Sequence, residues 1–354
     1  MAESTMSLAM TPERRAEPWL DWTVAVLGVW LVGAVHFDAW AHHRFELETF
    51  FTPWHGVLYT GFLVTVAVLG WTLLAGRRRG FPWPQAMPTG YWGSLLGVLV
   101  FLAGGVADMV WHTLLGIEVS VEALLSPPHL LLAAGGALMI TGPIRAAASG
   151  DGDRALPAPW PAVIALAMVL ALMTFFTAYA NPLSEAMLAQ GHRPATGEGV
   201  FLTQGLGTAG ILVQSVLMTG AILWALRRWR LPAGAISLIL TLSSLMTMAV
   251  HEVFQFLPGV VVAGLSADLL HQRLKPSVER PGDLRAFAAA VPVIFYVLYF
   301  VTLALTGGMW WRIHLWAGDI ILAGVVGGLL SHLMIPPAMR PGQAPATSGL
   351  RTGH

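Results

Sequence analysis

The chain has 354 residues, of which 56% are hydrophobic and 11% charged, whereas soluble domains carry about 25% charged residues. Acidic and basic side chains are equal in number, so the formal net charge is zero and no basic surface indicates a nucleic-acid partner. The sequence contains no cysteine, which excludes disulfides, thiolate metal sites and iron–sulfur clusters. A metal site in this chain would have to use histidine, carboxylate or methionine ligands.

Apolar stretches long enough to cross a bilayer recur along the whole sequence. They predict an all-α, polytopic membrane bundle of about ten transmembrane helices, of which the eighth is short and could be re-entrant. The longest loops, 76–90 and 181–199, are too short to fold alone, so we expect no soluble domain. The expected spans are residues 20–41, 54–75, 91–115, 127–148, 159–180, 200–226, 232–254, 257–273, 286–306 and 313–335.

Arginine residues cluster in alternate loops, and the positive-inside rule places these loops and both termini in the cytoplasm. The first apolar stretch lacks a small-residue cleavage site, so we expect a retained helix in a multi-pass protein of the cell (inner) membrane. The predicted organisation is a polar cytoplasmic N-terminus (1–18), a four-helix membrane unit (19–148), a six-helix membrane unit (157–335) and a disordered C-terminal tail (336–354).

A pattern of potential metal ligands lies at the outer end of the first two spans. Asp38 and His42 share one face of the first helix, because residues four apart lie one turn from each other. His55 begins the second helix, after Pro53, which suits a first helical turn, and Thr52, which can cap it. The sequence therefore predicts that these three ligands converge.

The same pattern occurs a second time, 70 residues later. Asp108 and His112 end the third span, and His129 opens the fourth after a Ser-Pro pair that matches Thr-Pro in the first copy. The repeat predicts a duplicated helical hairpin, 20–75 and 91–148, with both sites toward the outer face.

Ionisable groups at membrane depth are costly and rarely lack a partner, and here the expected partner is a metal ion. Two imidazoles and one carboxylate on a divalent first-row metal leave open positions for water, oxygen or a substrate. Without thiolates, the candidate ions are copper, iron, zinc or manganese. The alternative is that each Asp–His pair is a hydrogen-bonded pair that stabilises a helix end, which explains the third ligand less well.

Over about residues 30–145, the chain resembles the copper-site region of the C subunit of the particulate methane and ammonia monooxygenases. That subunit carries Asp-x3-His, twelve further residues, and a His preceded by Phe-Thr-Pro. In this chain, twelve residues also separate His42 from His55, within the run Phe51-Thr52-Pro53-Trp54-His55. The resemblance implies copper at Asp38, His42 and His55, and a second potential copper site at Asp108, His112 and His129.

The chain also departs from that family. The family has a second His pair about 70 residues after the first, but its leading position is usually Asn where this chain has Asp108, and its loop is shorter. The six spans after residue 157 carry no recognised motif of that subunit. The family enzymes work with two further subunits, so the resemblance implies membrane partner subunits or an electron donor.

Other polar groups are weaker candidates for a functional site. His36 is either an extra ligand or a buried hydrogen-bonded histidine, and Glu48 and Glu122 are either groups that orient an imidazole or solvated loop residues. Six more polar groups near helix ends could line a third polar site or a proton path, although hydrogen-bonded helix-end pairs explain them better. They are His251, Glu252, Asp268, His271, His314 and Asp319.

Three functions fit this pattern. The first is a copper-dependent membrane oxidase or monooxygenase that acts on a small apolar substrate entering from the lipid. The second is a copper-handling or transport protein without catalysis. The third is a zinc membrane hydrolase with Glu48 or Glu122 as general base. Whether the chain is an enzyme therefore stays open at the level of sequence.

Overall fold

The computed structural model describes residues 14–45, 51–116, 121–149, 158–185 and 188–334. Within these ranges the chain is helical and contains no strand. The predicted tail 336–354 and most of the N-terminal segment 1–18 lie outside the described residues. The main helices are α1 (Pro18–Arg44), α2 (Pro53–Arg78), α4 (Trp92–Leu115), α6 (Pro127–Ile140), α7 (Gly142–Ala148), α8 (Trp160–Phe175), α9 (Gly197–Arg228), α10 (Ala235–His251), α11 (Leu257–Leu274), α12 (Pro281–Thr306) and α13 (Ile313–Met334).

Seven of the described helices are long and apolar enough to cross a membrane, so the chain is a multi-pass helical membrane protein. The predicted fourth span is a pair, α6 and α7, bent by 46°. The predicted fifth and seventh spans correspond to α8 and α10, which have only 16 and 17 residues. Among the described residues, seven helices meet the length and composition of a membrane span, or eight with the bent pair taken as one, so the expected count of about ten is not confirmed.

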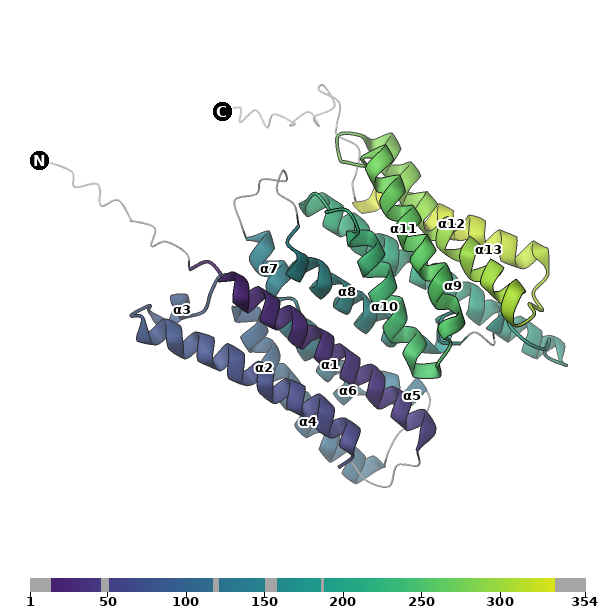
Figure 1. The fold of residues 1–354 in the computed structure, drawn as a ribbon. Helices are drawn as coiled ribbons and strands as arrows, with labels where there is room; N and C mark the ends of the chain where they lie inside the picture. Colours follow the sequence, from purple (N-terminus) through teal and green to yellow (C-terminus); the bar gives the residue numbers. More distant parts are fainter. Residues whose placement is uncertain (1–13, 46–50, 117–120, 150–157, 186–187, 335–354) are drawn as a thin grey trace, which may run out of the picture.

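The helices from the first 148 residues lie on one side of the molecule and the later ones on the other (Figure 1). On the first side α1 packs against α2 and α6, α4 packs against α6, and α2 contacts α4. On the second side α9 and α12 both pack against α13, and α11 lies between α10 and α12. Helix α1 also contacts α8 and α10 and so joins the two sides.

Small residues allow α4 and α6 to approach closely, as is common between membrane helices. A Cβ added at Gly135 would lie 2.5 Å from the backbone nitrogen of Phe101, and one at Gly97 would lie 2.7 Å from the Gly135 carbonyl oxygen. This contact fixes the second hairpin, whose connection contains a short helix, α5 (Val121–Leu125).

A hydrogen bond ties the two hairpins together at their other end. The Tyr91 hydroxyl, just before α4, donates to the Asp21 carboxylate in the first turn of α1 at 2.5 Å. Tyr91 is fully buried, so this bond satisfies a phenol and a carboxylate that are both largely removed from solvent. The bond holds the start of α4 beside the start of α1.

Candidate metal-binding sites

The first triad consists of Asp38, His42 and His55. His42 Nε2 lies 3.4 Å from Asp38 Oδ2, and His55 Nε2 lies 3.2 Å from Asp38 Oδ1. One potential ligand atom from each residue can be chosen so that all three lie within 4.8 Å of one another. The three side chains therefore converge, as expected from their spacing, and could share one ion.

Local sequence explains how α2 presents His55. The Thr52 hydroxyl accepts a hydrogen bond from the backbone N–H of His55 at 3.3 Å, which caps the helix, and Pro53 occupies the first turn. Phe45, just after α1, stacks on Trp54 with ring centroids 5.5 Å apart. These contacts hold the first turn of α2 against the last turn of α1, where Asp38 and His42 lie.

The second triad, Asp108, His112 and His129, has nearly the same geometry. His112 Nε2 and His129 Nε2 lie 3.3 and 3.2 Å from Asp108 Oδ1. The two imidazole centroids are 5.8 Å apart with planes at 56°, against 5.9 Å and 52° for the imidazoles of the first triad. Here, too, one atom from each residue falls within 4.8 Å of the others.

In both triads one carboxylate oxygen that faces an imidazole is buried. Asp38 Oδ1 and Asp108 Oδ1 form no hydrogen bond within the described part of the chain, although each lies 3.2 Å from an imidazole nitrogen. A buried carboxylate oxygen without a hydrogen bond is costly. A cation bound between the oxygen and the imidazoles would remove that cost.

The second triad has partners that orient its imidazoles. His129 Nδ1 lies 2.9 Å from the Ser126 hydroxyl, and His112 Nδ1 lies 3.3 Å from the Gly116 carbonyl oxygen, just past the end of α4. A carbonyl oxygen only accepts, so His112 donates from Nδ1, and in the neutral imidazole Nε2 carries the lone pair that a metal ion would use. Outer partners of this kind are typical of metal-binding histidines.

The two triads are linked by the contact between α2, which carries His55, and α4, which carries Asp108 and His112. One turn after His55, Tyr59 lies against Gly105, and one further turn along, Phe62 stacks on Phe101 with centroids 4.9 Å apart. Asp38 also lies close enough to the second triad for its charge to interact with the charges of Asp108 and His112.

Of the predicted additional groups, His36 and Glu122 do not join the triads. His36 is buried with its Nδ1 2.8 Å from the Val32 carbonyl oxygen, and its ring edge contacts Phe175 on α8. Glu122 is exposed, and the Nδ1 atoms of His112 and His129 face other groups. Glu48 lies outside the described residues.

The other polar groups mostly stabilise helix ends. Glu252, which ends α10, accepts hydrogen bonds from Trp40 at 2.9 Å and from Arg44. Asp268 accepts the backbone N–H groups of Ile236 and Ser237, at 3.3 and 2.8 Å, and so caps α10 from α11.

The remaining groups of that set lie apart from the triads. Asp319 is buried and accepts a hydrogen bond from Thr208 at 3.1 Å, while His271 packs its ring edge on Phe287 and His314 is exposed. His251 lies against His43 with ring centroids 4.6 Å apart, and its Nε2 is 3.9 Å from Glu185.

The roles of three residues in the site region, Ser126, Tyr59 and Gly105, were not identified from the sequence. The sequence does contain a signal for the orienting role of Ser126, because this residue lies three positions before His129 and a hydroxyl at that spacing can reach the imidazole. The contact between Tyr59 and Gly105 joins helices from the two different copies of the repeat, and no local pattern indicates it.

Comparison of the chain with protein-family models, with curated proteins and with solved structures found no match.

Proposed function

We propose that this membrane protein binds two transition-metal ions, preferably copper, one at each triad. The observation that carries the proposal is the convergence of a carboxylate and two imidazoles, twice, with potential ligand atoms within 4.8 Å of one another. The repeat of the same ligand geometry on two separate helix pairs supports a shared purpose for the two groups.

The metal-binding interpretation explains more than hydrogen-bonded Asp–His pairs do. A hydrogen-bonded Asp–His pair requires a hydrogen bond to the carboxylate, but Asp38 Oδ1 and Asp108 Oδ1 accept none within the described part of the chain. Metal ligands, in contrast, approach one another closely without hydrogen bonding, because each directs its lone pair at the ion.

Copper is the preferred ion because two imidazoles and a carboxylate suit it and no thiolate is present. The resemblance of residues 30–145 to the copper-site region of the monooxygenase C subunit also favours copper. Zinc and iron accept the same ligands and are the alternatives that metal analysis distinguishes. We place both sites toward the outer face, following the distribution of arginines.

The activity that we propose is oxidation of a small apolar substrate. A copper ion held by three protein ligands keeps open positions and supplies oxygen chemistry when bound. Around the second triad, α4 exposes Met109, Leu114 and Leu115, an apolar surface that would let a lipid-dissolved molecule approach. A membrane partner or electron donor would supply the reducing equivalents.

Copper handling without catalysis is the second candidate. The side chains of His42 and His129 are 29% and 27% exposed, so one imidazole of each triad is open to exchange with an incoming carrier. A zinc hydrolase has less support, because Glu122, the base it would use at the second triad, is exposed.

Metal analysis of the full chain, purified without chelator, tests the proposal. Wild-type protein should hold two ions, His55→Ala and His129→Ala one each, and the exposed-site control His314→Ala two. Equal metal content in all four proteins would refute binding at the triads. Oxygen consumption with a reductant, lost in either triad variant, would then distinguish oxidation from copper handling.

A further inference from the structure

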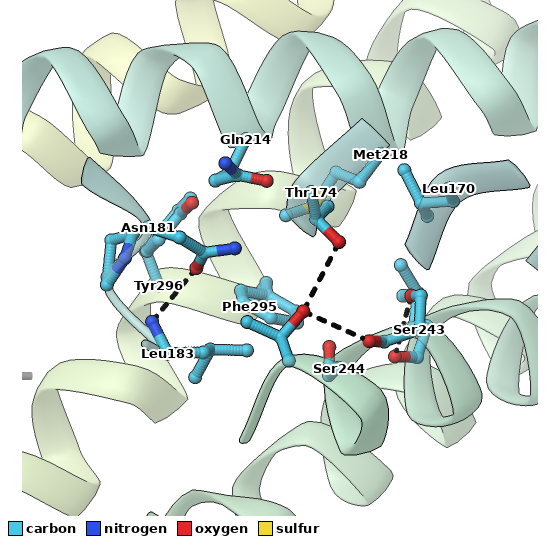
Figure 2. A pocket seen from close by; sticks show the side chains of 13 residues that line it. Leu170, Thr174, Asn181, Leu183, Gln214, Met218, Ser243, Ser244, Phe295 and Tyr296 are labelled. Carbon is cyan, nitrogen blue, oxygen red and sulfur yellow. Dashed lines mark hydrogen bonds between the residues drawn. The ribbon is translucent and has the colours of Figure 1, made fainter. Parts of the chain in front are cut away.

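A cavity of about 30 Å³ lies within the second half of the molecule, away from the triads in sequence (Figure 2). Helices α8, α9, α10 and α12 and residues 181–183 surround it. Part of its wall is apolar, including Leu170, Met218 and Phe295. The polar part of the wall consists of amide and hydroxyl side chains: Thr174, Asn181, Gln214, Ser243, Ser244, Thr247 and Tyr296.

One of the segments that border this cavity is not helical. Helix α8 ends at Phe175, and after a single 3-10 turn (Ala178–Ala180) the residues Asn181 to Ser184 are buried without helical structure. This segment lies against the middle of α9, where a Cβ on Gly210 would be 1.8 Å from the Ala180 carbonyl oxygen. Irregular backbone at membrane depth persists where it is buried or lines a cavity, and transporters place ligands at such breaks.

The two carboxamides of the cavity have defined orientations. The Asn181 side-chain oxygen accepts the backbone N–H of Leu183 at 3.0 Å, and its NH₂ group points into the space between the helices (Figure 2). The Gln214 NH₂ group donates to the Thr177 hydroxyl at 2.7 Å, so the carbonyl oxygen is the part that remains to accept a bond. The cavity therefore offers a donor and an acceptor from neighbouring elements.

Charge and size limit the ligand further. None of the described side chains that line the cavity is ionised at neutral pH, so nothing there offsets the desolvation of an ion. A cavity of this size limits the ligand to a molecule of a few non-hydrogen atoms.

We propose that this cavity is a binding site for a small neutral molecule that both donates and accepts hydrogen bonds, a short-chain alcohol or carboxamide. Asn181 donates to its oxygen and Gln214 accepts its N–H or O–H, while its carbon end lies against the apolar wall. The site is independent of the metal triads, and its test does not require a bound metal.

Because the chain contains no native cysteine, a cysteine introduced into the cavity can be labelled without background. In Ser244→Cys, a near-isosteric change, the small neutral reagent methyl methanethiosulfonate should modify the introduced thiol in the native protein. The control Ser331→Cys, also buried but on α13 and outside the cavity, should stay unmodified. If Ser244→Cys does not fold, Thr174→Cys probes the same cavity from α8.

Protection by a ligand then decides the proposal. Acetamide should slow labelling about tenfold at ten times its Kd, because only free sites react, whereas acetate, its charged counterpart of similar shape, should not. In Ser244→Cys/Gln214→Met, labelling should continue and the protection by acetamide should disappear. Labelling that neither acetamide nor methanol slows would mean that only water occupies the cavity, and this result overturns the proposal. Absence of labelling in a folded variant overturns it too.

Discussion

Tyr59 lies against Gly105, with its hydroxyl oxygen 3.2 Å from the point where a Cβ would stand on that glycine. His55 is one turn before Tyr59 on α2, and Asp108 is one turn after Gly105 on α4. The contact therefore lies beside both triads. The missing side chain at Gly105 determines how closely α2 and α4, and with them the two triads, approach.

Gly105→Ala should disturb this contact, because Tyr59 must move by a few tenths of an ångström to admit a methyl group. We expect a loss of about 1–3 kcal/mol in the free energy of unfolding, as for other overpacked sites. Denaturant unfolding in detergent measures it.

The control for that change is Gly136→Ala on α6, whose Cβ would meet nothing nearer than Phe101 at 4.0 Å. Adding Tyr59→Phe to Gly105→Ala should recover part of the loss, since the hydroxyl is the nearest atom. A loss in Gly105→Ala no greater than in Gly136→Ala would show that Tyr59 moves freely and does not set the helix spacing.

Ser126 and Thr52 hold matching places in the sequence but should have different effects when changed. Ser126→Ala removes the hydroxyl beside His129 Nδ1, so metal affinity at the second triad should fall about 10–100-fold. Thr52→Ala removes a helix cap and should cost about 0.5–2 kcal/mol of stability.

Metal titration and thermal unfolding of both variants separate these two effects. The first triad should keep its affinity in Ser126→Ala, and this provides an internal reference. If Ser126→Ala lowers only stability, the hydroxyl caps α6 and does not orient the imidazole.

Gly210→Ala should be among the most damaging single changes in the second half of the chain. A Cβ there would lie 1.8 Å from the Ala180 carbonyl oxygen, so α9 must separate from the non-helical segment that lines the cavity. We expect a loss of about 1–3 kcal/mol or more, whereas Gly205→Ala on the same helix, with nothing within 4 Å, should be tolerated. Similar melting temperatures for the two variants would contradict the close packing.

Asp268→Ala should weaken the start of α10. It leaves the backbone N–H groups of Ile236 and Ser237 without their acceptor in a buried position, at a cost of about 1–3 kcal/mol. The control Asp283→Ala breaks only a partly exposed ion pair with Arg280 and should cost about 0–1 kcal/mol. Equal losses in denaturant unfolding would mean that Asp268 is not the cap of α10.

Much of the site was predictable, because its ligands are local. Asp38 and His42 share a helix face through the α-helical repeat alone. A short connection, followed by the Thr-Pro start of the next helix, brings His55 to the same end. The same reasoning applies to the second copy. The internal symmetry of the two hairpins stays a prediction, and superposing them in an experimental structure would test it.

The sequence by itself determined the helical membrane class. Its long apolar stretches indicate segments that lie in lipid, and a backbone in lipid must form its hydrogen bonds internally, as an α-helix does. It also determined the members of each triad, because i, i+4 spacing and helix caps depend on near neighbours. It did not indicate the breaks in the spans, since a hydropathy window does not register that one span bends at Thr141 or that α8 ends at Phe175.

Only the tertiary structure decided which helices face one another. The contact of Tyr59 with Gly105, the capping of α10 by Asp268 and the cavity around Gln214 all join residues distant in sequence. Packing between membrane helices depends on small surface residues and buried polar pairs rather than on the hydrophobic pattern, because lipid and protein interior are almost equally apolar. That pattern therefore places each helix in the membrane without choosing its neighbours.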